Sequence, residues 1–245
     1  MTNPNSFAIL FYGLLMVVFP ETLADDKAVL CSFFLILATR RLISIRSLKG
    51  IKLKIFDATL WVMASSVFYD WALVYILLVF VAIYMYEPKN IRNWIVPLVA
   101  ILTFFAIGYA LLILTDDKEF ITRHYQFTFD FNIAYFLNWG DSSKLMVYVV
   151  LTLFAIVYSF LKLGKSGLGK IVTMRLVVLS FIIGIGLKIV VSSEDMDPIM
   201  VTFFPAVIFM TNYIEAIKKP KIKEAVLLAT IVVPILIFVS SSVIK

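Results

Sequence analysis

Long apolar runs separated by short charged segments dominate this sequence. A helix needs about 20 mostly apolar residues to cross the hydrocarbon core of a bilayer, so these runs constrain the fold more than any other feature. They cover residues 7–19, 28–39, 56–69, 71–86, 94–114, 144–163, 174–191, 199–217 and 225–239. The runs predict an all-α fold: a polytopic transmembrane helical bundle of about nine spans, forming a single integral membrane domain over residues 1–245.

Composition favours the same class. Hydrophobic residues make up 62% of the chain and charged residues 16%, whereas soluble domains have about 45–50% and about 25%. The net charge of +6 does not indicate a nucleic-acid partner, because the basic residues lie in short segments between apolar runs. The expected partner is therefore membrane lipid. Cys31 is the single cysteine, so no disulfide can form within the chain.

The charges of the loops alternate in sign along the chain. Segment 39–57 lies between two apolar runs and carries six of the 22 basic residues: Arg40, Arg41, Arg46, Lys49, Lys52 and Lys54. Most of the other basic residues fall in every second loop, and most of the 16 acids fall in the loops between. Because cytoplasmic loops of membrane proteins are rich in Lys and Arg, the pattern predicts a bacterial inner-membrane protein with its N-terminus inside and its C-terminus outside.

The longest polar stretch covers residues 115–143 and combines acids with many aromatic side chains. It is too polar to cross a membrane and too aromatic for a free linker. Aromatic rings with a polar edge prefer the boundary between membrane and water. The stretch therefore predicts an outer-face loop with one or two interfacial helices.

Three acids on the predicted outer face are candidates for chemistry. Asp25 and Asp26 follow Pro20 in an outer loop, and Asp70 lies between two short spans. Short spans beside long ones leave a cavity or a thinned membrane edge, through which a lipid-linked substrate would enter. The alternative is that all three are ordinary solvated loop residues.

Three cations are candidates for holding a substrate. Lys188 lies close to the outer end of its predicted span, where it either snorkels to the surface or contacts a phosphate or one of the outer-face acids. Arg123 and His124 form a basic spot in the acidic outer loop, which either holds a phosphate or carboxylate or stays solvated. His124 is the single histidine and no cysteine lies near it in the sequence, so a zinc site is not expected.

Several motifs resemble an uncharacterised multi-pass membrane protein family of flavobacteria-type bacteria. They are residues 40–49, 54–58, 64–71, 212–215 and 223–224. The resemblance covers most of the chain and implies an inner-membrane location without a particular activity. Some sequences of this kind carry a carotene-oxygenase label, but that chemistry needs several histidine ligands for iron and this chain has one.

A second resemblance starts at Phe19-Pro20 and continues through Asp25-Asp26 to Arg41, followed by a short hairpin, a long span and a large aromatic outer loop. This layout is similar to that of GT-C glycosyltransferases, multi-pass enzymes that use polyprenyl-phosphate sugars on the outer face. In them one acid of the first outer loop acts as base or metal ligand, and a second acid follows a Pro-containing turn. The resemblance implies that Asp25 or Asp26 is the second acid. The first outer loop of that layout and the span before it have no counterpart here. Two alternatives follow: the chain as given begins late and lacks about two spans, or it never had the first catalytic acid.

Two classes of function remain open. In the first, the protein transfers a glycosyl group from a lipid-phosphate sugar, with Asp25 and Asp26 as catalytic residues. A carboxylate acts as general base, and a divalent metal or the cations Lys188 and Arg123 hold the departing phosphate. The substrate-binding residues would be Asp70, Arg123, His124 and Lys188. In the second, the protein is an envelope-assembly or scaffold subunit whose outer loop docks a partner. A transporter ranks lower, because neither an internal repeat nor a mid-membrane acid is evident.

Overall fold

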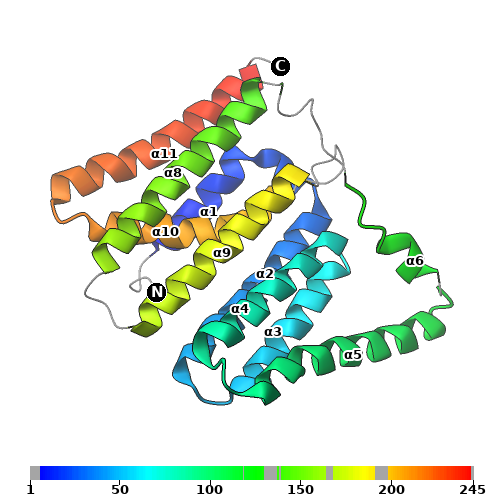
Figure 1. Ribbon diagram of the computed structural model, residues 1–245. Coiled ribbons are helices and arrows are strands. Elements are labelled where there is room, and N and C mark those ends of the chain that lie inside the picture. The colour runs from blue at the N-terminus through cyan, green and yellow to red at the C-terminus, as the bar shows by residue number, and fades with distance from the viewer. Residues whose placement is uncertain are drawn as a thin grey trace.

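The computed structural model describes residues 6–117, 119–129, 137, 139–163, 168–190 and 198–243, and within them every regular element is a helix, as predicted. The α-helices are α1 (Phe7–Val18), α2 (Asp26–Ser44), α3 (Ile51–Ser66), α4 (Ile76–Tyr86), α5 (Ile91–Leu114), α6 (Phe120–His124), α8 (Trp139–Leu163), α9 (Leu168–Val190), α10 (Phe203–Ala216) and α11 (Pro220–Val243). Four 3₁₀-helices connect them: η1 (Pro20–Leu23), η2 (Ile45–Ser47), η3 (Asp70–Tyr75) and η4 (Pro198–Thr202). Figure 1 shows α2, α3 and α4 side by side, with α5 leaving that group at an angle.

Among the described residues, five stretches are long and apolar enough to cross a membrane: Asp26–Ser47, Ile91–Leu114, Ser142–Lys162, Gly169–Val190 and Pro198–Ala216. They indicate a membrane location for the protein. Two shorter apolar helices cover Phe7–Val18 and Asp70–Tyr86. Each of the nine predicted runs coincides with a helix, but a crossing by α1, α3, η3–α4 or α11 remains a prediction. α3, for example, has 16 residues, which at 1.5 Å per residue fall short of a bilayer core about 30 Å thick.

The basic segment 39–57 is mostly helical rather than a long loop. α2 continues through Arg40 and Arg41 to Ser44, and α3 begins at Ile51, so the turn between the helices is short. Leu48 and Gly50, which end η2 and precede α3, have positive φ angles of 53° and 58° and reverse the chain. Lys and Arg are good helix formers whose long side chains reach water from a helix end, so a basic run does not have to leave the helix.

Two hydrophobic cores share helix α9. The first joins α1, α8 and α10, and it includes the buried side chains of Phe11, Tyr148 and Phe203. The second joins α2, α3, η3 and α4. α9 contributes Met174, Val177 and Phe181 to the first core and Leu176 and Leu187 to the second. These two sets lie on different faces of the helix, as the spacing of three and four residues requires, so α9 joins the two cores. The helices that form the two cores are here called the body.

Polar side chains bond inside the body where α9 meets its neighbours. The Tyr75 hydroxyl donates to the Ser180 carbonyl oxygen over 2.9 Å, and the Tyr148 and Thr202 hydroxyls lie 2.8 Å apart. The backbones approach closely at Gly184, because a Cβ atom there would lie 2.7 Å from Thr202 Cγ2 and 3.1 Å from the Tyr75 hydroxyl. Glycine is therefore required at this position of α9 by packing rather than by its φ angle.

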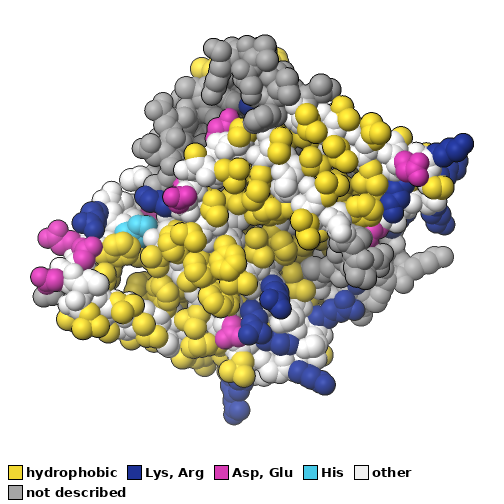
Figure 2. Space-filling model, turned by 180° about the vertical axis from the view of Figure 1, so that it is seen from behind, with side chains coloured by type: hydrophobic (Ala, Val, Ile, Leu, Met, Phe, Trp, Pro, Cys, Tyr) yellow, Lys and Arg dark blue, Asp and Glu magenta, His cyan; other side chains and the backbone are white. Residues whose placement is uncertain are grey.

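The bundle has two ends of opposite charge. The basic end holds the starts of α3, α5, α9 and α11 and the ends of α2, α4, α8 and α10. At this end an ion pair of 2.9 Å between Arg41 and Asp57 joins α2 to α3, and a hydrogen bond from Lys162 to the Ala216 carbonyl oxygen joins α8 to α10. Figure 2, which shows the molecule from behind, has Lys and Arg gathered mainly along its lower and right-hand edges, with a broad hydrophobic surface beside them. The opposite, acidic end holds η1, η3, η4 and α6. That the basic end is cytoplasmic remains a prediction.

Candidate functional site at the acidic end

A set of contacts, here called the clasp, joins the end of α3 and the start of η3 to the end of α6 and the segment that follows it. Its members are Ser66, Asp70 and Trp71 on the first side, and His124, Tyr125, Phe127 and Thr128 on the second. Asp70 Oδ2 accepts a hydrogen bond from the Phe127 backbone N–H over 2.9 Å. Trp71 Nε1 donates to the Thr128 carbonyl oxygen over 3.0 Å. The loop is thus held at the bundle by bonds that use main-chain atoms.

Ser66 forms the other half of the clasp. His124 Nε2 lies 2.8 Å from the Ser66 carbonyl oxygen, and the Tyr125 hydroxyl lies 3.0 Å from Ser66 Oγ. Burial raises the pKa of the Tyr125 phenol above its ordinary value of 10.0; the hydrogen bond with Ser66 opposes this shift and the Asp70 charge adds to it. Tyr125 is therefore a neutral hydroxyl at ordinary pH and suits a structural hydrogen bond.

Aromatic contacts cover these hydrogen bonds. The Trp71 ring lies edge-on to Phe127, with ring centroids 5.6 Å apart, and 4.7 Å from the centroid of Phe129. The His124 ring stacks on Phe120 at 5.0 Å. Such pairs contribute about 0.5–1.5 kcal/mol each beyond the area they bury, so the clasp is a packed joint as well as a hydrogen-bonded one.

The local sequence explains why the chain turns at the clasp. The hydroxyls of Ser65 and Ser66 donate to the carbonyl oxygens of Val62 and Met63, three residues back. Serine bonds of this kind compete with the main-chain ladder of a helix. Asp70 then accepts from the N–H of Trp71 over 2.7 Å at the start of η3. Both carboxylate oxygens of Asp70 therefore have backbone partners.

Asp25 and Asp26, the predicted catalytic acids, lie where α2 begins. Asp25 caps the helix: its Oδ1 accepts from the N–H groups of Lys27 and Ala28 over 3.0 and 3.1 Å. Asp26 is exposed in the first turn. A helix N-terminus favours negative charge at both positions. Capping of α2 is therefore enough to explain why two acids occur here, with or without a chemical role.

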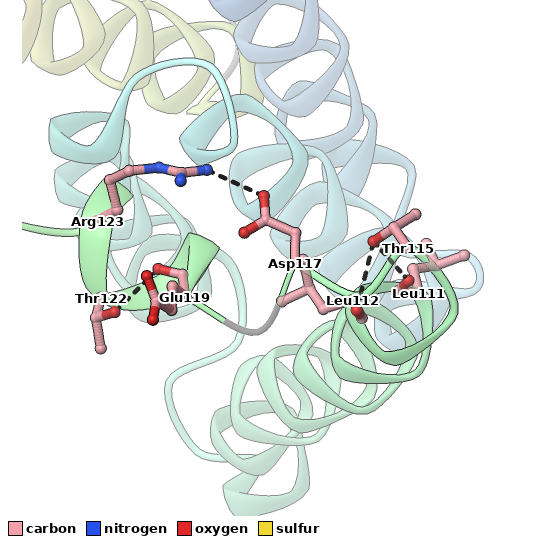
Figure 3. A network of polar contacts seen from close by, with 7 residues as sticks. All are labelled: Leu111, Leu112, Thr115, Asp117, Glu119, Thr122 and Arg123. Atoms are coloured by element: carbon pink, nitrogen blue, oxygen red, sulfur yellow. Dashed lines mark hydrogen bonds and ion pairs between the residues drawn. The ribbon is translucent and has the colours of Figure 1, made fainter.

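Arg123 and His124 are neighbours in sequence but have different partners. Figure 3 shows the Arg123 guanidinium pointing toward Asp117, with which it forms an ion pair at 3.0 Å, while Thr122 bonds back to the Glu119 carbonyl oxygen. The Arg123 side chain is 65% exposed, and an exposed ion pair contributes about 0–1 kcal/mol. His124 turns instead to the body. The structure thus brings Asp70 and His124 into one joint, with Arg123 beside it.

Lys188 is 1% exposed, three residues from the end of its predicted span. It therefore does not snorkel to the surface. A buried ammonium group is tolerated where hydrogen bonds or an acid compensate for lost hydration. The acids that follow it in sequence, Glu194, Asp195 and Asp197, lie outside the described residues.

One joint that includes Ser66, Trp71, Tyr125 and Phe127 was not predicted from the sequence. The alternation of aromatic residues at positions 125, 127 and 129 was a usable indication, because such a period of two is typical of an extended segment with one apolar face. Among the described residues no group of three or more His, Cys, Asp or Glu side chains is placed to hold a metal ion. A divalent metal remains a prediction.

Comparison of the chain with protein-family models, with curated proteins and with solved structures finds no match to any of them.

Proposed function

We propose that this membrane protein is a non-catalytic docking subunit that presents the loop of its acidic end to another envelope protein. The observation that carries the proposal is the use of the polar groups in the clasp. Asp70, Trp71 and His124 all bond to main-chain atoms of the opposite segment. They fix the position of a loop. A general base would instead need to reach a substrate proton.

The surface that the clasp holds in place supports docking. Phe127 and Phe129 are 39% and 73% exposed, although both pack against Trp71. Exposed aromatic side chains on a preorganised segment are typical of the centres of protein interfaces, because little entropy is lost when they bind. The partner would therefore offer an apolar surface to these rings at the membrane boundary.

Glycosyl transfer of the GT-C kind is the second candidate. It is favoured by the location of Asp25, Asp26 and the buried Lys188 toward the same end of the bundle. In this reading Asp26, which is exposed, would act as general base on the acceptor, and Lys188 would hold the phosphate of a polyprenyl-phosphate sugar.

Site-specific photo-crosslinking tests the docking proposal. A photoreactive residue at the exposed Gln126, beside the two rings, should give a discrete protein adduct in intact cells, and Asp70→Asn should abolish it by loosening the clasp. The matched position is Leu153, which is 47% exposed on α8; it should label lipid only. The absence of an Asp70-dependent adduct would contradict the proposal.

A turnover assay separates the two candidates. Membranes containing the protein are incubated with radiolabelled polyprenyl-phosphate sugar and compared with membranes containing Asp26→Asn. The docking proposal expects no turnover above the empty membrane from either. Turnover that is lost on Asp26→Asn would replace it with the glycosyltransferase.

A further inference from the structure

A groove between α3 and α5 opens at the basic end, away from the clasp. It has a volume of about 220 Å³ and is lined by Lys52, Leu53, Phe56, Arg92, Ile95, Val96 and Val99. Its wall is apolar apart from Lys52 and Arg92. Sites for drug-sized ligands have volumes of about 300–1,000 Å³, so this groove suits a segment of an acyl chain rather than a whole soluble ligand.

The two cations of the groove lie at one level of the bundle. Lys52 is in the first turn of α3 and Arg92 is in the first turn of α5, and both helices start at the basic end. Because each helix presents its positive dipole end there, the helix starts add to the charge of the two side chains. The mouth of the groove therefore attracts an anion at the membrane–water boundary, directly above an apolar slot.

The nearby acids do not neutralise this charge. Asp57 of α3 forms its 2.9 Å ion pair with Arg41 on the α2 side, and Glu87 accepts a hydrogen bond from Asn93 Nδ2 over 2.8 Å. The side chains of Lys52 and Arg92 form no ion pair or hydrogen bond with the part of the chain that the structure describes. Two cations are thus available to a ligand.

We propose that this groove binds one anionic phospholipid of the surrounding membrane. The phosphate lies between Lys52 and Arg92, and an acyl chain lies between α3 and α5 against Phe56, Ile95 and Val99. The pairing of charge and apolar surface selects this occupant, because basic sites between membrane helices bind anionic headgroups while the slot below takes hydrocarbon. The proposal is independent of whether the acidic end docks a partner or carries out chemistry.

Native mass spectrometry of the protein in detergent tests the proposal, with dimyristoyl phosphatidylglycerol as probe and dimyristoyl phosphatidylcholine as the neutral comparison. One Lys or Arg beside an anionic headgroup contributes about fivefold in binding. The double variant Lys52→Gln/Arg92→Gln should therefore retain phosphatidylglycerol about 25-fold more weakly. The matched control, Lys49→Gln/Lys89→Gln, removes two exposed cations from the same end but outside the groove and should change retention less than twofold.

A second variant tests the slot without changing any charge. Val99→Trp fills the groove from a position that is 47% exposed, so the helix tolerates it, and it should abolish tight retention of phosphatidylglycerol. Equal losses in the Lys52/Arg92 and Lys49/Lys89 variants would overturn the proposal in favour of non-specific surface charge. So would equal retention of both lipids, or a dimer that Val99→Trp dissociates and phosphatidylglycerol does not displace.

Discussion

The body and the arm of this protein differ in what surrounds equally apolar helices. The body comprises the helices of the two cores that share α9, and the arm comprises α5, α6 and the chain to residue 129. In Pro198–Ala216 of the body, 67% of the most apolar window is buried, whereas in α5 the share is 11%. α5 is nevertheless the most apolar of the five candidate spans. In a bilayer, lipid covers the surface of such a helix that protein does not cover. The apolar content of a helix therefore indicates that it lies in the membrane, and does not indicate that it is buried in the protein core.

The arm is attached at two places. The buried residues of α5 are Asn93, Pro97 and Ala100, all in its first half near the basic end, and none of the described residues of α6 is buried. The clasp provides the second attachment, at the acidic end. The body and the arm should therefore differ in their free energies of unfolding. Substitutions in the body should affect the stability of the whole fold, while substitutions in the clasp should release the arm alone.

The largest effect is expected at Gly184. Gly184→Val places a Cβ 2.7 Å from Thr202 Cγ2, and Thr202 cannot move freely because its hydroxyl bonds both Tyr148 and the Ile199 carbonyl oxygen. Overpacking of this kind costs about 3 kcal/mol, the upper part of the usual range. The free energy of unfolding in mixed micelles, measured by denaturant titration, should fall by that amount.

Gly186 provides the control for this prediction. It lies two residues along the same helix, and a Cβ there would meet no atom within 4 Å. Since valine and glycine have similar helix propensities, Gly186→Val should change stability by less than about 0.5 kcal/mol. Equal losses of unfolding free energy at the two positions would show that the close contact of α9 with Thr202 at Gly184 is not the cause of the loss.

The second prediction concerns release of the arm. Asp70→Asn replaces one of the two oxygens that accept backbone N–H groups, and leaving such a donor unpaired costs about 1–3 kcal/mol. Segment 120–129 should then exchange its amide hydrogens about 10–100-fold faster, while the midpoint of global unfolding stays unchanged. Asp26→Asn, at an exposed acid of the same end, should leave the exchange of segment 120–129 unchanged. A lower global midpoint in Asp70→Asn would mean that arm and body unfold together.

The sequence predicted the helices because apolar runs and turn residues are local properties. It also predicted the opposite charge of the two ends. It did not predict that α5 would stand apart from α9, since both read as apolar spans and only packing distinguishes them. Nor did it predict which partner each charged residue would take: Arg123 and His124 are adjacent in sequence, yet one bonds to Asp117 and the other to Ser66.

The burial of Lys188 was likewise beyond the sequence. Its position near a span end was equally compatible with a snorkelling side chain, and the choice depends on what the surrounding helices leave open. The same holds for the α3–α5 groove, because Lys52 and Arg92 are 40 residues apart and meet only through the packing of two helices.

The third prediction uses the titration of Tyr125. Its folded pKa is raised above 10.0, so the attached clasp favours the protonated phenol and the released clasp does not. The contribution of the protonated phenol to the stability of the attached clasp is complete below pH 10 and is lost as the pH rises through the folded pKa. Hydrogen exchange in segment 120–129 should therefore accelerate above pH 10 beyond the ordinary base catalysis seen in an unstructured peptide.

Tyr125→Phe should remove this additional pH dependence. At neutral pH it also removes the hydrogen bond with Ser66, which costs about 0.5–1.5 kcal/mol of clasp stability. If Tyr125→Phe and the unsubstituted protein show the same acceleration above pH 10, then another group controls the release of the arm.

The smallest effects are expected from two ion pairs of the part of the chain that the structure describes, one in each region. Arg41 and Asp57 join α2 to α3 at 2.9 Å in the body, and Arg123 and Asp117 lie 3.0 Å apart in the arm. The side chains of both pairs are partly exposed, so double-mutant cycles with Gln and Asn should give coupling energies of about 0.2–1 kcal/mol that decrease in high salt.

The two cycles should nevertheless differ in the property they change. The Arg41–Asp57 coupling should appear in the global free energy of unfolding, because α2 and α3 both belong to the core that α9 completes. The Arg123–Asp117 coupling should appear only in the local exchange of segment 120–129, because we expect the arm to open before the body unfolds. A coupling of the arm pair to the global free energy of unfolding would remove the distinction between the two regions, since it would require the arm to contribute to the cooperative core.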